Sequence, residues 1–175
     1  MAVVSAFSVI RALSLFHITL AFYFLTNPRL IADQNLVIIL GEAMQMPHTS
    51  EFNKPTPVTA FLAIILSFLG VSDLLSVSMV EHLAVEYWSS MTPIRLLFLF
   101  PLTAYTYMFK PDGFAPVNRA FYKPGPGDHL KNSLIFSWCF LETVMWFWVY
   151  VGLRDQRRSA AMKVLERKKA DEGMI

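Results

Sequence analysis

Apolar residues in this chain gather into four long stretches that are separated by shorter polar segments. The stretches cover about residues 5–26, 58–77, 93–109 and 133–153. A helix needs roughly 20 apolar residues to cross the hydrocarbon core of a bilayer. In lipid, every backbone polar group must find its partner inside the segment, which favours helices. The pattern therefore predicts an all-α fold, a four-helix transmembrane bundle.

Prolines and polar residues mark the expected ends of these spans. Asn27 and Pro28 end the first span, because proline lacks a backbone donor and disfavours helix in the residue before it. Pro93 suits the first turn of the third span, whereas Pro101 inside that span predicts a kink. The first span is expected to be retained and not cleaved as a signal peptide, since apolar residues also precede Arg11.

The segments between and after the spans divide the chain further. Residues 30–46 hold 11 apolar residues, too few to cross a bilayer, so they predict a short amphipathic helix, interfacial or re-entrant, that ends at Pro47. Residues 110–132 are rich in proline and glycine and predict an extended loop. After the fourth span, helix-forming residues predict that the last helix continues into water. The expected organisation is a membrane domain, residues 1–153, and a basic helical tail, residues 154–175.

The composition fits a membrane protein and excludes several classes of function. Hydrophobic residues make up 55% of the chain and charged residues 16%, against about 25% charge in a typical soluble domain. The single cysteine, Cys139, excludes an intrachain disulfide and a cysteine-based zinc site. The histidines outside the spans lack metal-ligand spacing, and no phosphate-binding, dinucleotide or nucleophile motif is present. We therefore expect no metal, no cofactor and no nucleic-acid partner.

Positive charge is concentrated in the C-terminal tail, and this bias predicts the topology. Lys/Arg clusters mark cytosolic segments, so four spans would place both termini in the cytosol. The same charges predict contact with anionic lipid headgroups. Further expected partners are other membrane lipids and either a membrane-protein partner or a second copy of the chain. Trp146, Trp148 and Tyr150 are expected in an aromatic belt at the cytosolic interface. The basic cluster consists of Arg154, Arg157, Arg158, Lys163, Arg167, Lys168 and Lys169.

Ionisable residues inside the spans are the candidate functional residues, because an Asp or Arg at a helix centre costs about 2.5–3.5 kcal/mol to insert. Asp73 and Arg95 are expected roughly 3–8 Å inside the same membrane face. A short loop joins their helices, so we expect them to form an ion pair. Glu142 is expected near the membrane centre, with His17 and Tyr105 at similar depth. We expect Glu142 to face the bundle interior with His17 or Tyr105 as its partner.

Each of these candidates also has a structural interpretation. The Asp73–Arg95 pair would serve as a clamp that sets helix pairing, and Glu142 as a satisfied polar contact that holds the bundle together. His17 would be a packed, hydrogen-bonded histidine. Small residues such as Gly70 would permit close contact between helices.

Five short motifs follow one another in an order and spacing typical of one family. They are AFYFLTN, EAMQMP, GVSDLL, TPIRLLFLF and CFLETVMWFWVYVGLRDQ. In these motifs the chain resembles the fungal "increased loss of mitochondrial DNA" membrane-protein family, and Asp73, Arg95 and Glu142 fall on motif positions. The resemblance implies a multi-pass protein of the endoplasmic reticulum membrane. It implies no settled activity and no catalytic residues.

Three functions are compatible with these features. The first is a non-enzymatic membrane-homeostasis factor or complex subunit that affects mitochondrial DNA maintenance indirectly. The second is a cation pathway, for potassium or protons, with Glu142 and Asp73 as its carboxylates. The third is a lipid- or sterol-modifying enzyme in which His17 and Glu142 act as an intramembrane acid–base pair.

Overall fold

In the computed structural model the described residues are 5–48, 51–110, 125 and 127–172, and side chains are described as far as Arg158, with Met162 in addition. The regular elements of these residues are all helices. Four are long: α1 (Ala6–Thr26), α4 (Pro57–Val77), α5 (Glu81–Met108) and α6 (Ser133–Glu172). Three are short: α2 (Arg29–Ala32), α3 (Asn35–Ala43) and the 3-10 helix η2 (Asp128–Leu130).

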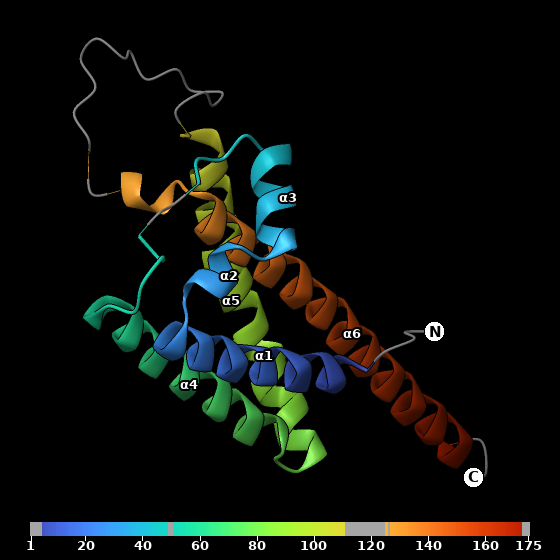
Figure 1. The fold of residues 1–175 in the computed structure, drawn as a ribbon. Helices are drawn as coiled ribbons and strands as arrows, with labels where there is room; N and C mark the ends of the chain where they lie inside the picture. The colour runs from blue at the N-terminus through green and yellow to red at the C-terminus, as the bar shows by residue number, and fades with distance from the viewer. Residues whose placement is uncertain (1–4, 49–50, 111–124, 126, 173–175) are drawn as a thin grey trace.

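The four long helices are arranged as two pairs that pass across each other (Figure 1). Helix α1 packs along α4, and α5 packs along α6. Helix α1 also contacts α6, whereas α4 and α5 share few contacts. Helix α3 packs on α6, where Gly41 lies so close that an added Cβ would be 2.8 Å from the Cβ of Ser133.

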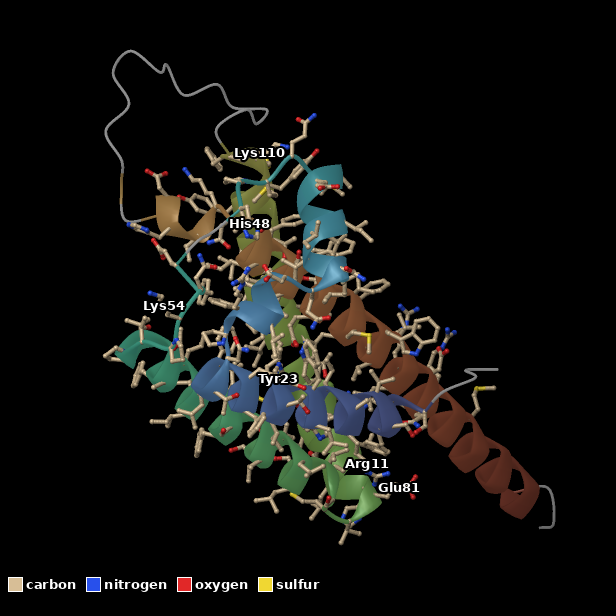
Figure 2. All side chains as sticks on the ribbon, in the orientation of Figure 1. Arg11, Tyr23, His48, Lys54, Glu81 and Lys110 are labelled. Carbon is tan, nitrogen blue, oxygen red and sulfur yellow. The ribbon has the colours of Figure 1, made fainter. Side chains whose placement is uncertain are left out.

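The two ends of the molecule carry different parts of the chain. Figure 1 shows the start of α1, the α4–α5 turn and the C-terminal part of α6 toward one end, with α2 and α3 toward the other. In Figure 2, Arg11 and Glu81 lie toward the first end, and His48 and Lys110 toward the second. The start of α1 and the C-terminal part of α6 therefore lie toward the same end. The assignment of that end to the cytosol stays a prediction.

Local sequence explains where the first two long helices begin. Ser5 caps α1, since its side chain accepts a hydrogen bond from the backbone N–H of Ser8. Thr56 and Thr59 form reciprocal side-chain bonds at the start of α4, with Pro57 in the first turn. These ends agree with the expected spans to within one residue.

Among the described residues, three helices are long and apolar enough to cross a membrane. They are α1, α4 and the Ser133–Arg158 part of α6. Helix α5 is not among them; besides Glu81 and Glu86 in its first half, it carries Arg95 and several hydroxyl residues in its second. The fold is therefore all-α with three candidate spans, and the fourth span stays a prediction.

The prediction that Pro93 lies in the first turn of its helix is wrong. Helix α5 begins at Glu81, and both Pro93 and Pro101 lie inside it. Glu81 in the first turn interacts favourably with the helix dipole, which helps the polar segment before Pro93 to form helix. Each of these prolines removes one backbone hydrogen bond from the helix, because proline has no N–H donor.

The segments outside the long helices also differ in part from expectation. The single helix expected over 30–46 is divided into α2 and α3 by a break at Asp33 and Gln34. The last helix continues past Leu153 to Glu172, as expected. Residues 111–124 of the expected loop lie outside the described residues. The same holds for the side chains of four tail residues, Lys163, Arg167, Lys168 and Lys169.

Buried apolar side chains form two clusters with polar residues between them. The first cluster includes Ile10, Leu13, Val77, Leu99 and Val149. The second includes Ala21, Phe24, Ala63, Leu66 and Leu134. Along α1, α4 and α6, one buried ionisable residue lies between the positions that belong to the two clusters. The fold therefore holds a polar layer between two apolar ones.

Candidate functional site: a buried polar network

Each of the four long helices contributes one ionisable side chain to this polar layer. His17 comes from α1, Asp73 from α4, Arg95 from α5 and Glu142 from α6. His17, Asp73 and Glu142 are buried, with 0%, 2% and 3% of their surface exposed. Groups buried this deeply need protein partners, because burial without a compensating hydrogen bond or charge costs free energy.

Glu142 has a protein partner for each of its carboxyl oxygens. Oε1 lies 2.9 Å from Nε2 of His17, and Oε2 accepts a 2.8 Å hydrogen bond from the indole N–H of Trp146. Trp146 lies four residues further along α6, a spacing at which two side chains meet on one helix face. The expected inward orientation of Glu142 is therefore present, with His17 as the partner from another helix.

Tyr105 is not part of this contact. Its ring packs against Phe109, and the ammonium of Lys131 lies 5.6 Å from its ring centre. An added Cβ at Gly127 would meet the Tyr105 hydroxyl, so the side chain points toward the segment before η2. The prediction of similar depth did not account for the direction in which the side chain leaves α5.

Asp73 and Arg95 form the expected ion pair, with two parallel hydrogen bonds. Nη1 of Arg95 donates to Oδ2 over 2.7 Å, and Nη2 donates to Oδ1 over 2.6 Å. Fork-to-fork pairing of this kind fixes the orientation of both side chains. Because α4 and α5 share few other contacts, this pair is a principal link between them.

Trp146 connects the two pairs. Its ring centre lies 4.3 Å from the Arg95 guanidinium carbon, and the ring of Trp88 lies 5.1 Å from that carbon. The two indole rings stack with centres 5.4 Å apart and planes 21° apart. A cation over desolvated aromatic faces gains about 2 kcal/mol. The contacts therefore run without a break from Asp73 through Arg95, Trp146 and Glu142 to His17.

The position of Trp146 differs from the interfacial one predicted from the sequence. It is 1% exposed and belongs to the core, whereas Trp148 and Tyr150 remain exposed. Sequence reasoning treated the two polar pairs as separate and missed Trp146 and Trp88 as members of the site. The four-residue spacing between Glu142 and Trp146 was the signal that could have identified the first of them.

Gly70 lets α1 and α4 approach closely enough to place His17 and Asp73 in the layer. An added Cβ at Gly70 would be 2.7 Å from the backbone oxygen of Ser14 and 3.2 Å from the Cβ of His17. Gly70 lies about one helical turn before Asp73, and Ser14 about one turn before His17. The expected role of Gly70 in close helix packing is therefore confirmed.

The burial of both carboxylates limits the chemistry open to this network, and Arg95, with 20% of its side chain exposed, is its most accessible charged member. Both carboxylates use both of their oxygens in bonds to protein. Nδ1 of His17 is buried and has no hydrogen-bond partner among the described residues. Within the same residues, no group of three or more His, Cys, Asp or Glu side chains is placed to hold a metal ion. The arrangement is suited to fixing helix positions and orienting charges.

Comparison with known proteins relates this arrangement to one family. The family model described as "Increased loss of mitochondrial DNA protein 1" matches residues 4–163. Protein ILM1 of Saccharomyces cerevisiae is 28% identical over 142 residues, which cover 81% of this chain and 61% of that protein. Protein ilm1 of Schizosaccharomyces pombe is 25% identical over 167 residues, which cover 93% of this chain and 89% of that protein. No solved structure matches the chain.

Proposed function

This chain belongs to the family of increased loss of mitochondrial DNA proteins, and we propose that it is a multi-pass protein of the endoplasmic reticulum membrane that catalyses no reaction. It acts as a membrane-homeostasis factor or as a subunit of a larger membrane complex, and its effect on mitochondrial DNA maintenance is indirect. The family name supports the link to mitochondrial DNA, and three apolar helices support a membrane location.

One observation carries this proposal: the buried carboxylates are bonded to protein and enclosed. Each oxygen of Glu142 is bonded, one to His17 and one to Trp146, and both oxygens of Asp73 are bonded to Arg95. A cation pathway or an acid–base enzyme would require Glu142 to reach an ion or a substrate atom. Buried polar contacts of this kind instead rigidify a core and specify one arrangement of its helices. This favours a scaffolding role over the two alternatives.

The proposed orientation places both termini in the cytosol. Arg154, Arg157 and Arg158 are exposed on the continuing α6 helix, where they would meet anionic headgroups of the cytosolic leaflet. The start of α1 and the α4–α5 turn lie toward the same end of the molecule as this part of α6 (Figure 1).

Complementation in fission yeast tests whether the buried carboxylates have a chemical role. The chain would be expressed in cells that lack Protein ilm1, and retention of mitochondrial DNA would be scored. Glu142→Gln keeps an oxygen for Trp146 and an amide donor for His17 but removes the acid–base group. The proposal predicts that Glu142→Gln complements as well as the unchanged chain. Loss of complementation by a folded, correctly located Glu142→Gln protein would contradict it.

Purification from mild detergent tests the partner part of the proposal. The tagged chain is expected to recover other membrane proteins in fixed stoichiometry. Recovery as a lone monomer that still complements would contradict a role as a complex subunit.

Fluorescence of the tagged chain should overlap an endoplasmic reticulum marker, and overlap with a mitochondrial marker alone would contradict the proposed location.

A further inference from the structure

An elongated apolar groove runs between α5 and α6, away from the buried polar network. Its volume is about 610 Å³, and the end of α3 closes part of it at Met44. Phe100 and Tyr107 line it from α5, and Phe140 and Phe147 from α6. Phe100 and Phe147 are each 51% exposed, so the walls are open to whatever surrounds the helices. Neither Glu142 nor His17 lines this groove.

The shape and lining of the groove favour a lipid chain over a protein helix. Its α6 wall extends from Phe136 to Phe147, about 16 Å at 1.5 Å of rise per residue. Helices that associate in membranes meet through small residues that let backbones approach. Here five of the ten lining residues are aromatic, and the small residues between them are Thr103, Ala104 and Thr143. A flexible acyl chain can fill such a groove, whereas the rings would hold a second helix away.

A buried cation lies at the α3 end of the groove. Lys110 is 7% exposed, and its ammonium lies 4.8 Å from the ring centre of Tyr107. It also donates a hydrogen bond to the backbone oxygen of Met44, and both Met44 and Tyr107 line the groove. An ammonium has three N–H donors, so two remain for another acceptor. None of the described residues supplies a carboxylate to Lys110.

We propose that this groove binds one acyl chain of an anionic glycerophospholipid, whose phosphate is held by Lys110. The aromatic walls would bury the chain, and the ammonium would complement the negative headgroup at the level where the helices end. Figure 2 shows Lys110 and His48 toward this same end of the molecule, which would place the headgroup at the membrane surface. The hydrogen bond to Met44 also holds α3 in place, so any test must separate that role from lipid binding.

Native mass spectrometry of the full chain in detergent provides the test. The probes are phosphatidylserine and phosphatidylcholine with identical dioleoyl chains. The unchanged protein is expected to retain one lipid per chain, with about a fivefold preference for phosphatidylserine. Ala104→Trp places a bulky indole at the groove lining and should abolish retention of both lipids. Leu97→Trp, at a 76% exposed position on the same helix but outside the groove, should bind like the unchanged protein.

Two substitutions at Lys110 separate the headgroup contact from the anchoring of α3. Lys110→Gln keeps a donor for Met44 and should retain lipid while losing the preference for phosphatidylserine. Lys110→Arg should keep that preference. Equal binding of both lipids by the unchanged protein would overturn the proposal, as would full retention by Ala104→Trp. Detection of a dimer that Ala104→Trp abolishes would also overturn it, by identifying the groove as a contact between two copies.

Discussion

The charge of Arg95 lies between a carboxylate and two indole rings, and its removal would leave the buried Asp73 without a partner. Asp73 is 2% exposed and receives both of its hydrogen bonds from this guanidinium. Arg95→Met is therefore expected to lower the free energy of unfolding by about 3–5 kcal/mol, because an unpaired buried charge remains. Unfolding of the purified protein in mixed micelles measures this loss.

The double variant Asp73→Leu/Arg95→Met is the matched control for that substitution. It removes both charges and fills the space with apolar atoms, which is often neutral for stability. Most of the lost stability should therefore return. A double variant that is as unstable as Arg95→Met alone would contradict the assignment of Arg95 as the partner that Asp73 requires.

Trp146 has two separable roles, one through its ring and one through its N–H. Trp146→Phe keeps an aromatic face for Arg95 but removes the donor to Oε2 of Glu142. Leaving that buried oxygen without a partner is expected to cost about 1–3 kcal/mol of unfolding free energy. Trp148→Phe is the control, since Trp148 is 52% exposed and a change there should stay within about 0.5 kcal/mol. Equal effects of the two substitutions would contradict the role of the N–H.

At the scale of helices, the α1–α4 contact depends on the missing side chain of Gly70. A Cβ there would lie 2.7 Å from a backbone oxygen of α1, which cannot move without shifting the helix. Gly70→Ala gains about 1 kcal/mol of helix propensity, but overpacking costs about 1–3 kcal/mol. We expect a net loss of thermal stability, measured by circular dichroism. Gly125→Ala is the control, because no atom lies within 4 Å of the added Cβ, and it should leave the thermal stability unchanged. A Gly70→Ala protein with unchanged thermal stability would contradict the close approach of α1 and α4.

The sequence predicts best the helices whose ends are marked by capping residues or prolines in the segment itself. Ser5, Thr56 and Pro57 start α1 and α4 as capping chemistry requires, and Asn27 ends α1. The start of α5 was missed because its first half is polar and Pro93 resembles a first-turn proline. That half is helical because Ala84 and Trp88 pack into the core formed with α6. This packing depends on tertiary contacts that hydropathy along one segment does not contain.

The polar network likewise includes contacts that follow from local sequence and contacts that depend on tertiary packing. The Asp73–Arg95 pair could be predicted because a short turn limits where its two helices can lie. His17 was one of the two partners expected for Glu142. Similar depth in the membrane could not decide between His17 and Tyr105. Trp146 was assigned to the interface because tryptophans are common there. Its burial follows from the stacking on Trp88 of α5, which joins residues far apart in the sequence.

At the scale of the whole molecule, the arrangement of helix ends makes a prediction about topology. The start of α1 and the C-terminal part of α6 lie toward the end that also carries the α4–α5 turn, and α3 lies toward the other (Figure 1). If the first end is cytosolic, a glycosylation acceptor fused to either terminus should stay unmodified. An acceptor inserted between α3 and α4 should be glycosylated in microsomes. Modification of either terminal acceptor would contradict this topology.

The central claim is that one network joins all four long helices, and a double-mutant cycle tests it most directly. Glu142→Gln and Asp73→Asn act on pairs that are connected through Trp146 and Arg95. Unfolding free energies of both single variants and the double variant would be measured in the same micelles. The network predicts a coupling energy of about 0.5–3 kcal/mol between the two positions. Effects that add to within about 0.3 kcal/mol would show two independent pairs and contradict a single network.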